Sequence, residues 1–493
     1  MNHFHGRDLD FTDFQQLLQN KKAKLATCQG RRRIGKSTFI TQCADETTHF
    51  INISGLAPRS DLDRTAQLEN FSQELSPQLN TPKIPLSDWP TAFHYLATIL
   101  PKTGSTLLLL DEISWMAIGD PDFPGHLKNA WDQHFSKHSG LILVLCGSVS
   151  SWIEKNILNH TGFVGRISWQ FHLEPLPLQH CNAFWKNHET CSKREIPSFE
   201  KLRLLSVTGG VPRYLEAINF RQSAEKNIAR LCFRSGGLLF NEFEQIFHDI
   251  FTRKAPSYRA IVRTLINGPR TLREISEALN RESGGSLTEA LANLAGSGFI
   301  TAEHSISPTT AKPLARTIRY RLTDNYLRFY LKYVEPHREQ ITKGIYTLSP
   351  LESLEAWDTI IGLQFENLIY NSRHELLDLL GISQNTLNYG PFFQNQTQRK
   401  KACQVDLLIR TQSALYLIET KARKSISVSV IDEVAEKITR LHPPKNLAVR
   451  TALVYQGELS PTLAQSDYFD HTISFDQLLN YQTPRPKRKR KSS

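Results

Sequence analysis

The segment Gly30–Ser37 has the residue types and the spacing of a phosphate-binding loop. Its sequence, GRRRIGKS, follows the pattern G-x-x-x-x-G-K-S and lies between the apolar stretch KLATC and the helix-forming stretch STFITQC. In such a loop the backbone amides and the helix N-terminus face phosphate oxygens. Lys36 can reach the β- and γ-phosphates, and the Ser37 hydroxyl can ligate Mg²⁺. We therefore expect ATP with Mg²⁺, or GTP as the alternative, to bind to Gly30, Arg31, Arg32, Arg33, Ile34, Gly35, Lys36, Ser37 and Thr38.

A second segment, TLLLLDE at Thr106–Glu112, supplies the acids that such a loop needs. Its uncharged run predicts a strand buried on both faces, as in the middle of a parallel sheet. The carboxyl ends of such strands are where these sheets bind ligands. We expect Asp111 to hold Mg²⁺ through water and Glu112 to orient and polarise the attacking water, so that ATP is hydrolysed.

Four residues nearer the C-terminus indicate a different chemistry. Glu366 lies in the amphipathic stretch GLQFENLIY, Asp406 in QVDLLI, and Glu419 and Lys421 in LYLIETKAR. Residues two apart on a strand share a face, and a hairpin can bring Asp406 beside the Glu419–Lys421 pair. Carboxylates such as Asp406 and Glu419 bind Mg²⁺, and a lysine can position or activate water. This combination is what metal-assisted phosphodiester cleavage requires.

The elements that must position these residues are short strands alternating with helical stretches from residue 1 to about 178. This pattern predicts the α/β class, with a parallel sheet covered by helices. Gly147 and Ser148 end the fourth strand at the same edge, where Ser148 can hydrogen-bond the water or the γ-phosphate. The expected strands are Lys24–Cys28, Thr48–Ile53, Thr106–Asp111, Leu141–Cys146 and Ser168–Leu173, and a further hairpin is expected from Gln404–Arg410 and Ala414–Lys421.

The stretch from about 255 to 335 predicts three helices followed by two strands, the order of a winged helix. We expect a helix at Ile261–Ile266, a second one capped by Thr271 and a third one capped by Ser286. A strand beginning in GSGFI then pairs with Thr317–Leu322.

The third of these helices, SLTEALANLA, carries an acid, Glu289, and no lysine or arginine. Groove-reading helices need polar or positive side chains, so sequence-specific DNA reading is not expected. Loose DNA contact and packing against protein remain alternatives. The basic side chains available for DNA contact are Arg281, Arg316, Arg319 and Arg321.

The order of the motifs in roughly residues 1–335 resembles that of the archaeal-type P-loop ATPases, in the neighbourhood of the AAA+ and signal-transduction ATPases. The resemblance is carried by Gly6-Arg7, GRRRIGKS, LLLLDE, CGS, VGR and GGVPRYL. It implies that Arg166 occupies the place of an arginine finger and Arg213 that of a lid sensor arginine, both reading the γ-phosphate. A surface ion pair is the alternative for Arg166. Ser148 departs from the asparagine usual in AAA+ proteins.

The C-terminal part resembles the PD-(D/E)xK nuclease superfamily through Glu366, Asp406 and the E-x-K pair Glu419 and Lys421. Archaeal-type ATPases often carry such a domain at this position. The resemblance implies a nuclease fold, with an inert relative of that fold as the alternative.

These observations predict an ATPase coupled to a nuclease-like domain that acts on DNA. The alternative is an ATP-dependent switch or assembly scaffold for a protein partner, with an inert C-terminal domain; a homo-oligomer fits either. The expected domains are a P-loop ATPase core at 1–178, a helical lid at 179–250, a winged helix at 251–335, a nuclease-like domain at 336–483 and a basic disordered tail at 484–493.

Composition is consistent with this organisation. A chain of 493 residues is too long for one core, and 40% hydrophobic with 22% charged residues is ordinary for a soluble protein. The sequence has no bilayer-length apolar run and no secretory signal, so we expect a cytoplasmic protein without membrane contact. The seven cysteines contain no CxxC pair and predict free thiols. Much of the net charge of +11 lies in the tail, in Arg485, Lys487, Arg488, Lys489, Arg490 and Lys491. Such a tail attracts polyanions and could contact nucleic acid or direct nuclear import, and a solubilising tail is the alternative.

Overall fold

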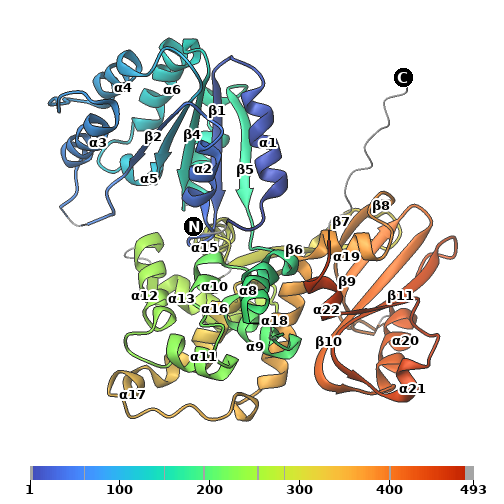
Figure 1. Cartoon of the computed structure of the whole chain (residues 1–493). Helices are drawn as coiled ribbons and strands as arrows, with labels where there is room; N and C mark the ends of the chain where they lie inside the picture. Colours follow the sequence, from blue (N-terminus) through green and yellow to red (C-terminus); the bar gives the residue numbers. More distant parts are fainter. Residues whose placement is uncertain are drawn as a thin grey trace. The chain divides into compact units, whose positions relative to one another are not determined.

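The computed structural model describes residues 4–59, 61–148, 150–192, 195–251, 255–282, 284–398 and 401–482, so the expected tail at 484–493 lies outside the described residues. Figure 1 follows the chain through its elements. The first of two compact units comprises Met1–Glu174, Glu244–Arg259 and Glu289–Phe299; the second comprises Pro175–Phe243, Ala260–Thr288 and Ile300–Ser493. Within the described ranges, no helix is both long enough and apolar enough to cross a membrane.

A five-stranded sheet with all strands parallel forms the centre of the first unit, in the order β2-β3-β4-β1-β5. The predicted α/β class and its five strands are confirmed, with the bounds of Thr106–Asp111 unchanged and the ends of the other four shifted by at most two residues. The strands are β1 (Lys24–Gly30), β2 (His49–Ser54), β3 (Thr106–Asp111), β4 (Leu141–Gly147) and β5 (Ile167–Leu173).

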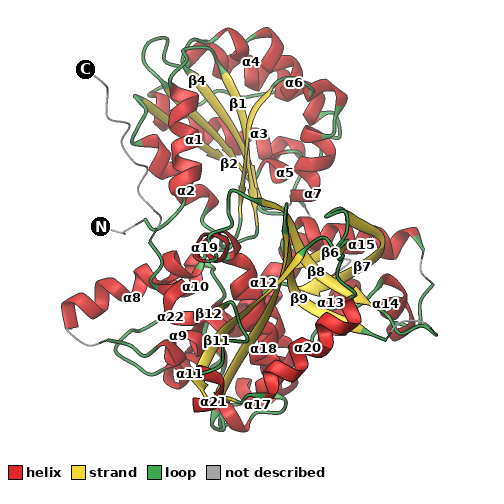
Figure 2. Ribbon diagram, turned by 90° about the vertical axis from the view of Figure 1, so that its right-hand side faces the viewer, coloured by secondary structure: helices red, strands yellow, loops and turns green. Residues whose placement is uncertain are grey.

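Helices cover both faces of this sheet (Figure 2). Successive side chains of a strand point to opposite faces, so the residues of β3 pack into two separate cores. Leu108 and Leu110 belong to one apolar cluster, with Trp89 and Phe93 among its members. Leu107 and Leu109 belong to another cluster on the opposite face. The helices are α1 (Asp8–Leu18), α2 (Lys36–Ala44), α3 (Arg64–Leu79), α4 (Trp89–Ile99), α5 (Ile113–Met116), α6 (Phe123–Gln133) and α7 (Ser150–Ile153), with short turns at Phe135–Lys137, Glu154–Leu158 and Thr161–Phe163.

The chain after β5 is helical. Gly210 makes a close approach there, because a Cβ on it would lie 2.1 Å from the Leu176 carbonyl oxygen. The Leu176 amide in turn donates to the Gly210 carbonyl at 2.7 Å. These helices are α8 (Leu178–Ser192), α9 (Ser198–Thr208), α10 (Pro212–Glu216), α11 (Ala224–Cys232) and α12 (Leu238–Phe251).

Three helices and a hairpin follow: α13 (Ala255–Thr264), α14 (Leu272–Ala278), α15 (Gly285–Gly296), β6 (Ile300–Ile306) and β7 (Pro313–Leu322). The strands pair antiparallel. Thr271 caps α14 in a capping box with Glu274, as predicted. The predicted cap at Ser286 is wrong, because α15 already begins at Gly285. The amides of Leu287 and Thr288 bond instead to the Gly284 carbonyl, so the chain enters the helix earlier.

The last part of the chain carries a second five-stranded sheet, in the order β12-β11-β10-β9-β8. Strands β8, β9 and β10 are antiparallel, whereas β10, β11 and β12 are parallel. The predicted hairpin is present as β9 (Cys403–Thr411) and β10 (Ala414–Ile426). The other strands are β8 (Thr386–Gln394), β11 (Ala448–Leu459) and β12 (His471–Ser474).

The core of this sheet takes residues from outside the sheet. Val430 and Val434 of α20 (Ser429–Leu441) are buried in it, together with Ile306 of β6. The hairpin β6–β7 therefore shares a core with the second sheet. The remaining helices are α16 (Asn325–Phe329), α17 (Arg338–Thr342), α18 (Trp357–Asn371), α19 (Arg373–Leu379), α21 (Pro461–Ala464) and α22 (Phe475–Leu479), with short turns at Tyr330–Val334, Glu335–His337 and Leu351–Ser353.

Candidate functional site

The loop between β1 and α2 encloses the ammonium group of Lys36. Gly30 ends β1 with a φ of +145°, and a Cβ there would lie 2.4 Å from the Leu173 carbonyl oxygen. Gly35, with a φ of +89°, precedes α2. Lys36 is only 6% exposed, and its Nζ donates to the carbonyl oxygens of Gly30 at 3.0 Å and Arg31 at 3.2 Å. A positive charge is thus fixed inside a glycine-bounded loop at a helix N-terminus, which is an environment suited to phosphate.

The other residues of this loop divide between core and surface. Ile34 is buried in the apolar cluster that also contains Phe39. Ser37 and Thr38 are exposed in the first turn of α2. Arg32 and Arg33 are half-buried. The backbone of Arg33 has a φ of 68°, a left-handed conformation that residues other than glycine rarely adopt.

Two contacts within the first unit hold the loop from outside. The Arg31 guanidinium carbon lies 5.9 Å from the ring centroid of Phe299. Arg7 donates through Nη2 to the carbonyl oxygens of Glu174 at 2.6 Å and Ile34 at 3.4 Å. The Arg7 contacts tie the N-terminal segment and the end of β5 to the same loop.

Ser37 and the acids at the end of β3 meet directly. The Ser37 Oγ donates to Asp111 Oδ2 at 2.6 Å, and the Glu112 amide donates to Asp111 Oδ1 at 2.9 Å. Glu112 has a φ of 49° and a ψ of 50°, a left-handed conformation that costs a non-glycine residue roughly 1–3 kcal/mol. A hydroxyl and a carboxylate in contact are the hard oxygen donors that Mg²⁺ prefers, so these residues fit the ion.

Ser148, at the end of β4, hydrogen-bonds to Glu112. Its amide donates to Glu112 Oε2 at 3.1 Å, and its hydroxyl donates to Glu112 Oε1. The sequence indicated Ser148 as a partner of water or phosphate and did not indicate this pair. The pair could have been predicted from the two buried strands β3 and β4, because adjacent parallel strands end at the same edge of a sheet.

Arg166 precedes β5 and forms a bidentate pair with Asp132 of α6. Its Nε and Nη2 donate to the two Asp132 carboxylate oxygens at 2.6 and 2.9 Å, and Lys128 lies 2.9 Å from the same carboxylate. The hydrogen bonds from Arg166, together with the one from Lys128, lower the pKa of Asp132 to about 2. Arg213, on α10, lies 3.5 Å from Glu216 and is exposed.

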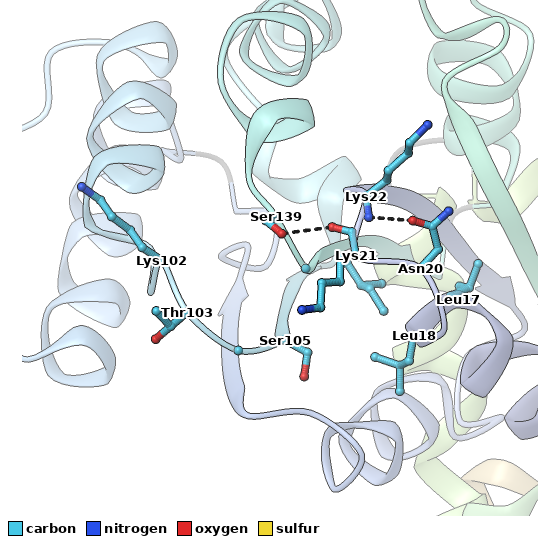
Figure 3. A pocket seen from close by; sticks show the side chains of 12 residues that line it. Leu17, Leu18, Asn20, Lys21, Lys22, Lys102, Thr103, Ser105 and Ser139 are labelled. Carbon is cyan, nitrogen blue, oxygen red and sulfur yellow. Dashed lines mark hydrogen bonds between the residues drawn. The ribbon is translucent and has the colours of Figure 1, made fainter.

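A pocket of about 490 Å³ lies at the opposite, amino-terminal edge of the sheet (Figure 3). It is lined by segments that precede β1, β3 and β4, including Lys21, Lys22 and Lys102. The ammonium groups of Lys22 and Lys102 point away from one another, and Lys21 extends between them (Figure 3). These lysines do not converge on one point, so the candidate chemistry of this unit stays at the carboxyl edge.

The carboxylates of the C-terminal hairpin adjoin in the second unit. Ile418 pairs with Leu407 in the antiparallel register, which puts Glu419 of β10 next to Asp406 of β9. Thr420 donates to Asp406 Oδ2 through its amide at 3.3 Å and its hydroxyl at 3.0 Å. Burial, and after it the charge of Asp406, raises the pKa of Glu419.

Two lysines contact Glu419, one at each carboxylate oxygen. Lys421 Nζ lies 2.9 Å from Oε1, on the same face of β10, and Lys437 Nζ donates to Oε2 at 2.6 Å. Lys421 also donates to Glu433 at 2.7 Å. Burial opposes the charge of Lys437, yet the carboxylates of Asp406 and Glu419 raise its pKa. Lys437 and Glu433 lie on α20, far from the E-x-K spacing, so the sequence did not point to them.

Glu366, on α18, is bonded to the hairpin β6–β7. Arg321 of β7 donates to Glu366 Oε2 at 2.7 Å and to Glu303 Oε1 at 2.8 Å. Burial, followed by the charge of Asp406, raises the pKa of Glu366, while Arg321 acts in the opposite direction. The expectation that Arg321 is available for DNA phosphates is wrong, because it is buried between two carboxylates.

The carboxylates of this second site are suitable ligands for a divalent cation. Both oxygens of Glu419, however, already accept hydrogen bonds from lysines. Among the side chains that the structure describes, no three His, Cys, Asp or Glu are grouped as ligands of a metal ion. Any cation held here would depend chiefly on Asp406 and Glu419.

Comparison with known proteins gives a limited result. No protein-family model matches the chain. The uncharacterized protein MJECL04 of Methanocaldococcus jannaschii is 22% identical over 397 residues, covering 79% of this chain and 80% of that protein. Identity at this level does not assign a family.

The chain also resembles several solved structures. The Walker-type ATPase PABY2304 of Pyrococcus abyssi has a TM-score of 0.49 and 18% identity, covering 66% of this chain and 96% of that one. The ORC2 protein of Aeropyrum pernix has a TM-score of 0.41 and 13% identity, covering 70% and 97%. The branch-migration motor RuvB of Thermotoga maritima has a TM-score of 0.33 and 16% identity, covering 61% and 90%. Likeness this distant leaves the chemistry to be argued from the site itself.

Replacing Arg321 by methionine tests the buried ion-pair triad. Arg321 is 5% exposed and Glu303 is also 5% exposed, so Arg321→Met leaves the buried Glu303 and the half-buried Glu366 without this cation. Removing one partner of a buried pair destabilises by about 3–5 kcal/mol. We expect a loss of that size in the free energy of unfolding, measured by urea denaturation.

The matched control for this measurement is Arg450→Met. Arg450 pairs with Asp470 at 2.7 Å, but its side chain is 52% exposed. Such surface pairs contribute about 0–1 kcal/mol. Equal losses in the two variants would contradict the assigned role of Arg321.

Proposed function

We propose that the chain binds ATP with Mg²⁺ on Gly30–Thr38 and hydrolyses it. The observation that carries the proposal is the 2.6 Å hydrogen bond between Ser37 Oγ and Asp111 Oδ2, beside the buried Lys36 ammonium. Lys36 neutralises phosphate charge, and Ser37 and Asp111 offer oxygen ligands to the cation. Mg²⁺, when bound, offsets the charge that develops on the transferred phosphoryl group.

Glu112 is the residue that orients the attacking water in this proposal. The Ser148 hydroxyl and amide both bond to its carboxylate, and its backbone is held in the left-handed region. Each carboxylate oxygen of Glu112 accepts one bond from Ser148 and keeps a second lone pair that can accept a hydrogen bond from water. Ser148 is thus a positioning residue, because its two bonds hold the Glu112 carboxylate in place.

We further infer that ATP turnover is coupled to phosphodiester cleavage in DNA at the C-terminal site. The adjoining carboxylates Asp406 and Glu419 and the lysine Lys421 support this inference. A divalent cation, when bound, polarises the phosphodiester. Asp406 and Glu419 would hold that cation, Lys421 would position water, and Glu366 would position the hairpin through Arg321.

The second candidate function is an ATP-dependent switch or scaffold for a protein partner, with an inert C-terminal domain. Specific contacts favour it. Both oxygens of Glu419 are bonded to lysines, and Glu366 is bonded to Arg321. The helix α15 carries no basic residue that could contact DNA.

Lys36→Ala tests nucleotide binding. The variant removes the charged donor of the loop, and a hydrogen bond to a charged group contributes about 1.5–3 kcal/mol. We expect ATP affinity, measured by calorimetric titration with Mg²⁺ present, to fall about tenfold or more. We also expect phosphate release to stop. Lys22→Ala, an exposed lysine at the other edge of the sheet, should bind and turn over ATP as the wild type does. Unchanged turnover in Lys36→Ala would refute the proposal.

A comparison of Arg166→Ala with Asp132→Asn distinguishes an arginine finger from a surface ion pair. Both variants break the pair between Arg166 and Asp132. A finger contributes about 10³-fold or more to hydrolysis. We therefore expect Arg166→Ala to slow ATP hydrolysis by that order with unchanged ATP affinity, and Asp132→Asn to remain active. Full activity in Arg166→Ala would assign the arginine to the ion pair alone.

Asp406→Ala tests the C-terminal chemistry. Supercoiled plasmid is incubated with the full chain, ATP and either Mg²⁺ or Mn²⁺, and nicked and linear products are resolved on a gel. Loss of a metal-binding carboxylate should slow cleavage on the order of a hundredfold. Asp470→Ala, a carboxylate that pairs with Arg450 at the surface, is the control. Absence of cleavage by the wild type, or equal cleavage by Asp406→Ala, would favour the switch.

A further inference from the structure

A pocket of about 420 Å³ opens beside Asp406 in the second unit. It is lined by residues of β7, of the ends of β8 and β9, and of α20. Its lining includes three cationic side chains, Arg319, Lys437 and Arg440, and a single acid, Asp406. The amides of Gln394 and Asn395 complete a wall of hydrogen-bonding groups. This composition suits a ligand that carries negative charge and many acceptor oxygens.

The three cations differ in how they are engaged. Lys437 donates to Glu419 at 2.6 Å. Arg440 donates to the Ala402 carbonyl at 2.9 Å and pairs with Glu436. Arg319 forms no ion pair with any residue in the described part of the chain, and its Nη2 donates to the Asn395 side-chain oxygen at 3.1 Å. Arg319 is therefore the cation of this pocket that is in direct contact with no described carboxylate, although its charge also acts on Glu274.

Aromatic packing fixes the Arg319 side chain. Its guanidinium carbon lies 4.7 Å from the ring centroid of Phe393, on β8. Stacking on a ring leaves the planar edge of a guanidinium free to bond oxygens in two directions. With Asn395 bonded to Nη2 and the Phe393 ring against the guanidinium, the side chain has lost much of its rotamer freedom before any ligand arrives.

The hairpin that carries Arg319 is anchored to the second sheet. Ser305 Oγ accepts from the Phe393 amide at 2.6 Å and donates to the Phe393 carbonyl at 3.3 Å. Ile306 lies in the core of that sheet, and a Cβ on Gly390 would come within 3.2 Å of it. Arg319 thus has a fixed position at the rim of the pocket, although it comes from the strand that follows the three helices α13–α15.

We propose that this pocket is a phosphate subsite for a nucleic-acid backbone, in which Arg319 is a positioning residue. The inference rests on the cleavage proposed at Asp406 and Glu419. Arginine binds phosphate oxygens in a bidentate manner, and such contacts set the register of the backbone without reading its sequence. Arg319 holds one phosphate while an adjoining phosphodiester lies at Asp406. The hairpin β6–β7, and not helix α15, which has no lysine or arginine, makes the DNA contact of this region.

Arg319→Ala and Arg319→Lys test the subsite in the full chain. Binding of a short fluorescent DNA duplex is followed by anisotropy in EDTA, over a series of salt concentrations. We expect Arg319→Ala to weaken binding roughly tenfold at low salt and to reduce the salt slope by about one. Arg319→Lys should keep the slope and lose part of the affinity, since lysine keeps the charge but not the fork. In cleavage assays, Arg319→Ala should raise KM for DNA with kcat unchanged.

Arg273→Ala is the matched control, because Arg273 on α14 is 87% exposed and pairs with Glu277. Its DNA affinity and salt slope should equal those of the wild type. If the wild type binds DNA and Arg319→Ala binds it with the same affinity and slope, the subsite is overturned and the proposed cleavage stands. If the wild type neither binds nor cleaves DNA, the proposed cleavage fails and the subsite fails with it.

Discussion

The parallel pairing of β1 with β4 and of β4 with β3 is the constraint on which the nucleotide site depends. Parallel strands end at one edge of a sheet, so the residues that follow them meet there whatever their separation along the chain. Lys36 and Ser37 come after β1, Asp111 ends β3, and Ser148 follows β4. The hydrogen bond from Ser37 to Asp111 and the bonds from Ser148 to Glu112 cross between these strand ends.

The C-terminal site is assembled by a different device. There an antiparallel hairpin brings Asp406 beside Glu419, and charges from α20 and β7 surround the carboxylates. Burying a carboxylate without a cation is costly, and here Glu419 is paired with Lys421 and Lys437, and Glu366 with Arg321. The same partners compete with any metal ion for the carboxylate oxygens. Whether the site is catalytic therefore depends on how readily Lys437 and Lys421 release Glu419.

Sequence patterns predicted those parts of the fold that local physics determines. The apolar run TLLLLDE predicted the position of β3, because a strand buried on both faces needs consecutive apolar residues. GRRRIGKS predicted the loop before α2, because such a loop needs glycines at fixed spacing. The cap at Ser286 failed because a backbone carbonyl, which has no residue signature, took its place. Lys437 and Arg321 were missed as partners because ion pairs across distant elements follow no spacing rule. The roles of Arg166 and Arg213 stay predictions.

The hairpin β6–β7 shows why a boundary drawn from element order differs from one drawn from packing. In order, it completes the three helices α13–α15, and the sequence placed the next domain only after residue 335. In packing, the segment Glu289–Phe299 belongs to the first unit, whereas Ile300 onward belongs to the second. Ile306 enters the core of the second sheet, and Ser305 bonds to the backbone of β8. Since Arg321 from this hairpin holds Glu366 and Arg319 lines the pocket at Asp406, displacement of the hairpin would disturb both the carboxylates and the cationic wall. The hairpin is therefore better regarded as a structural part of the C-terminal site than as a free wing.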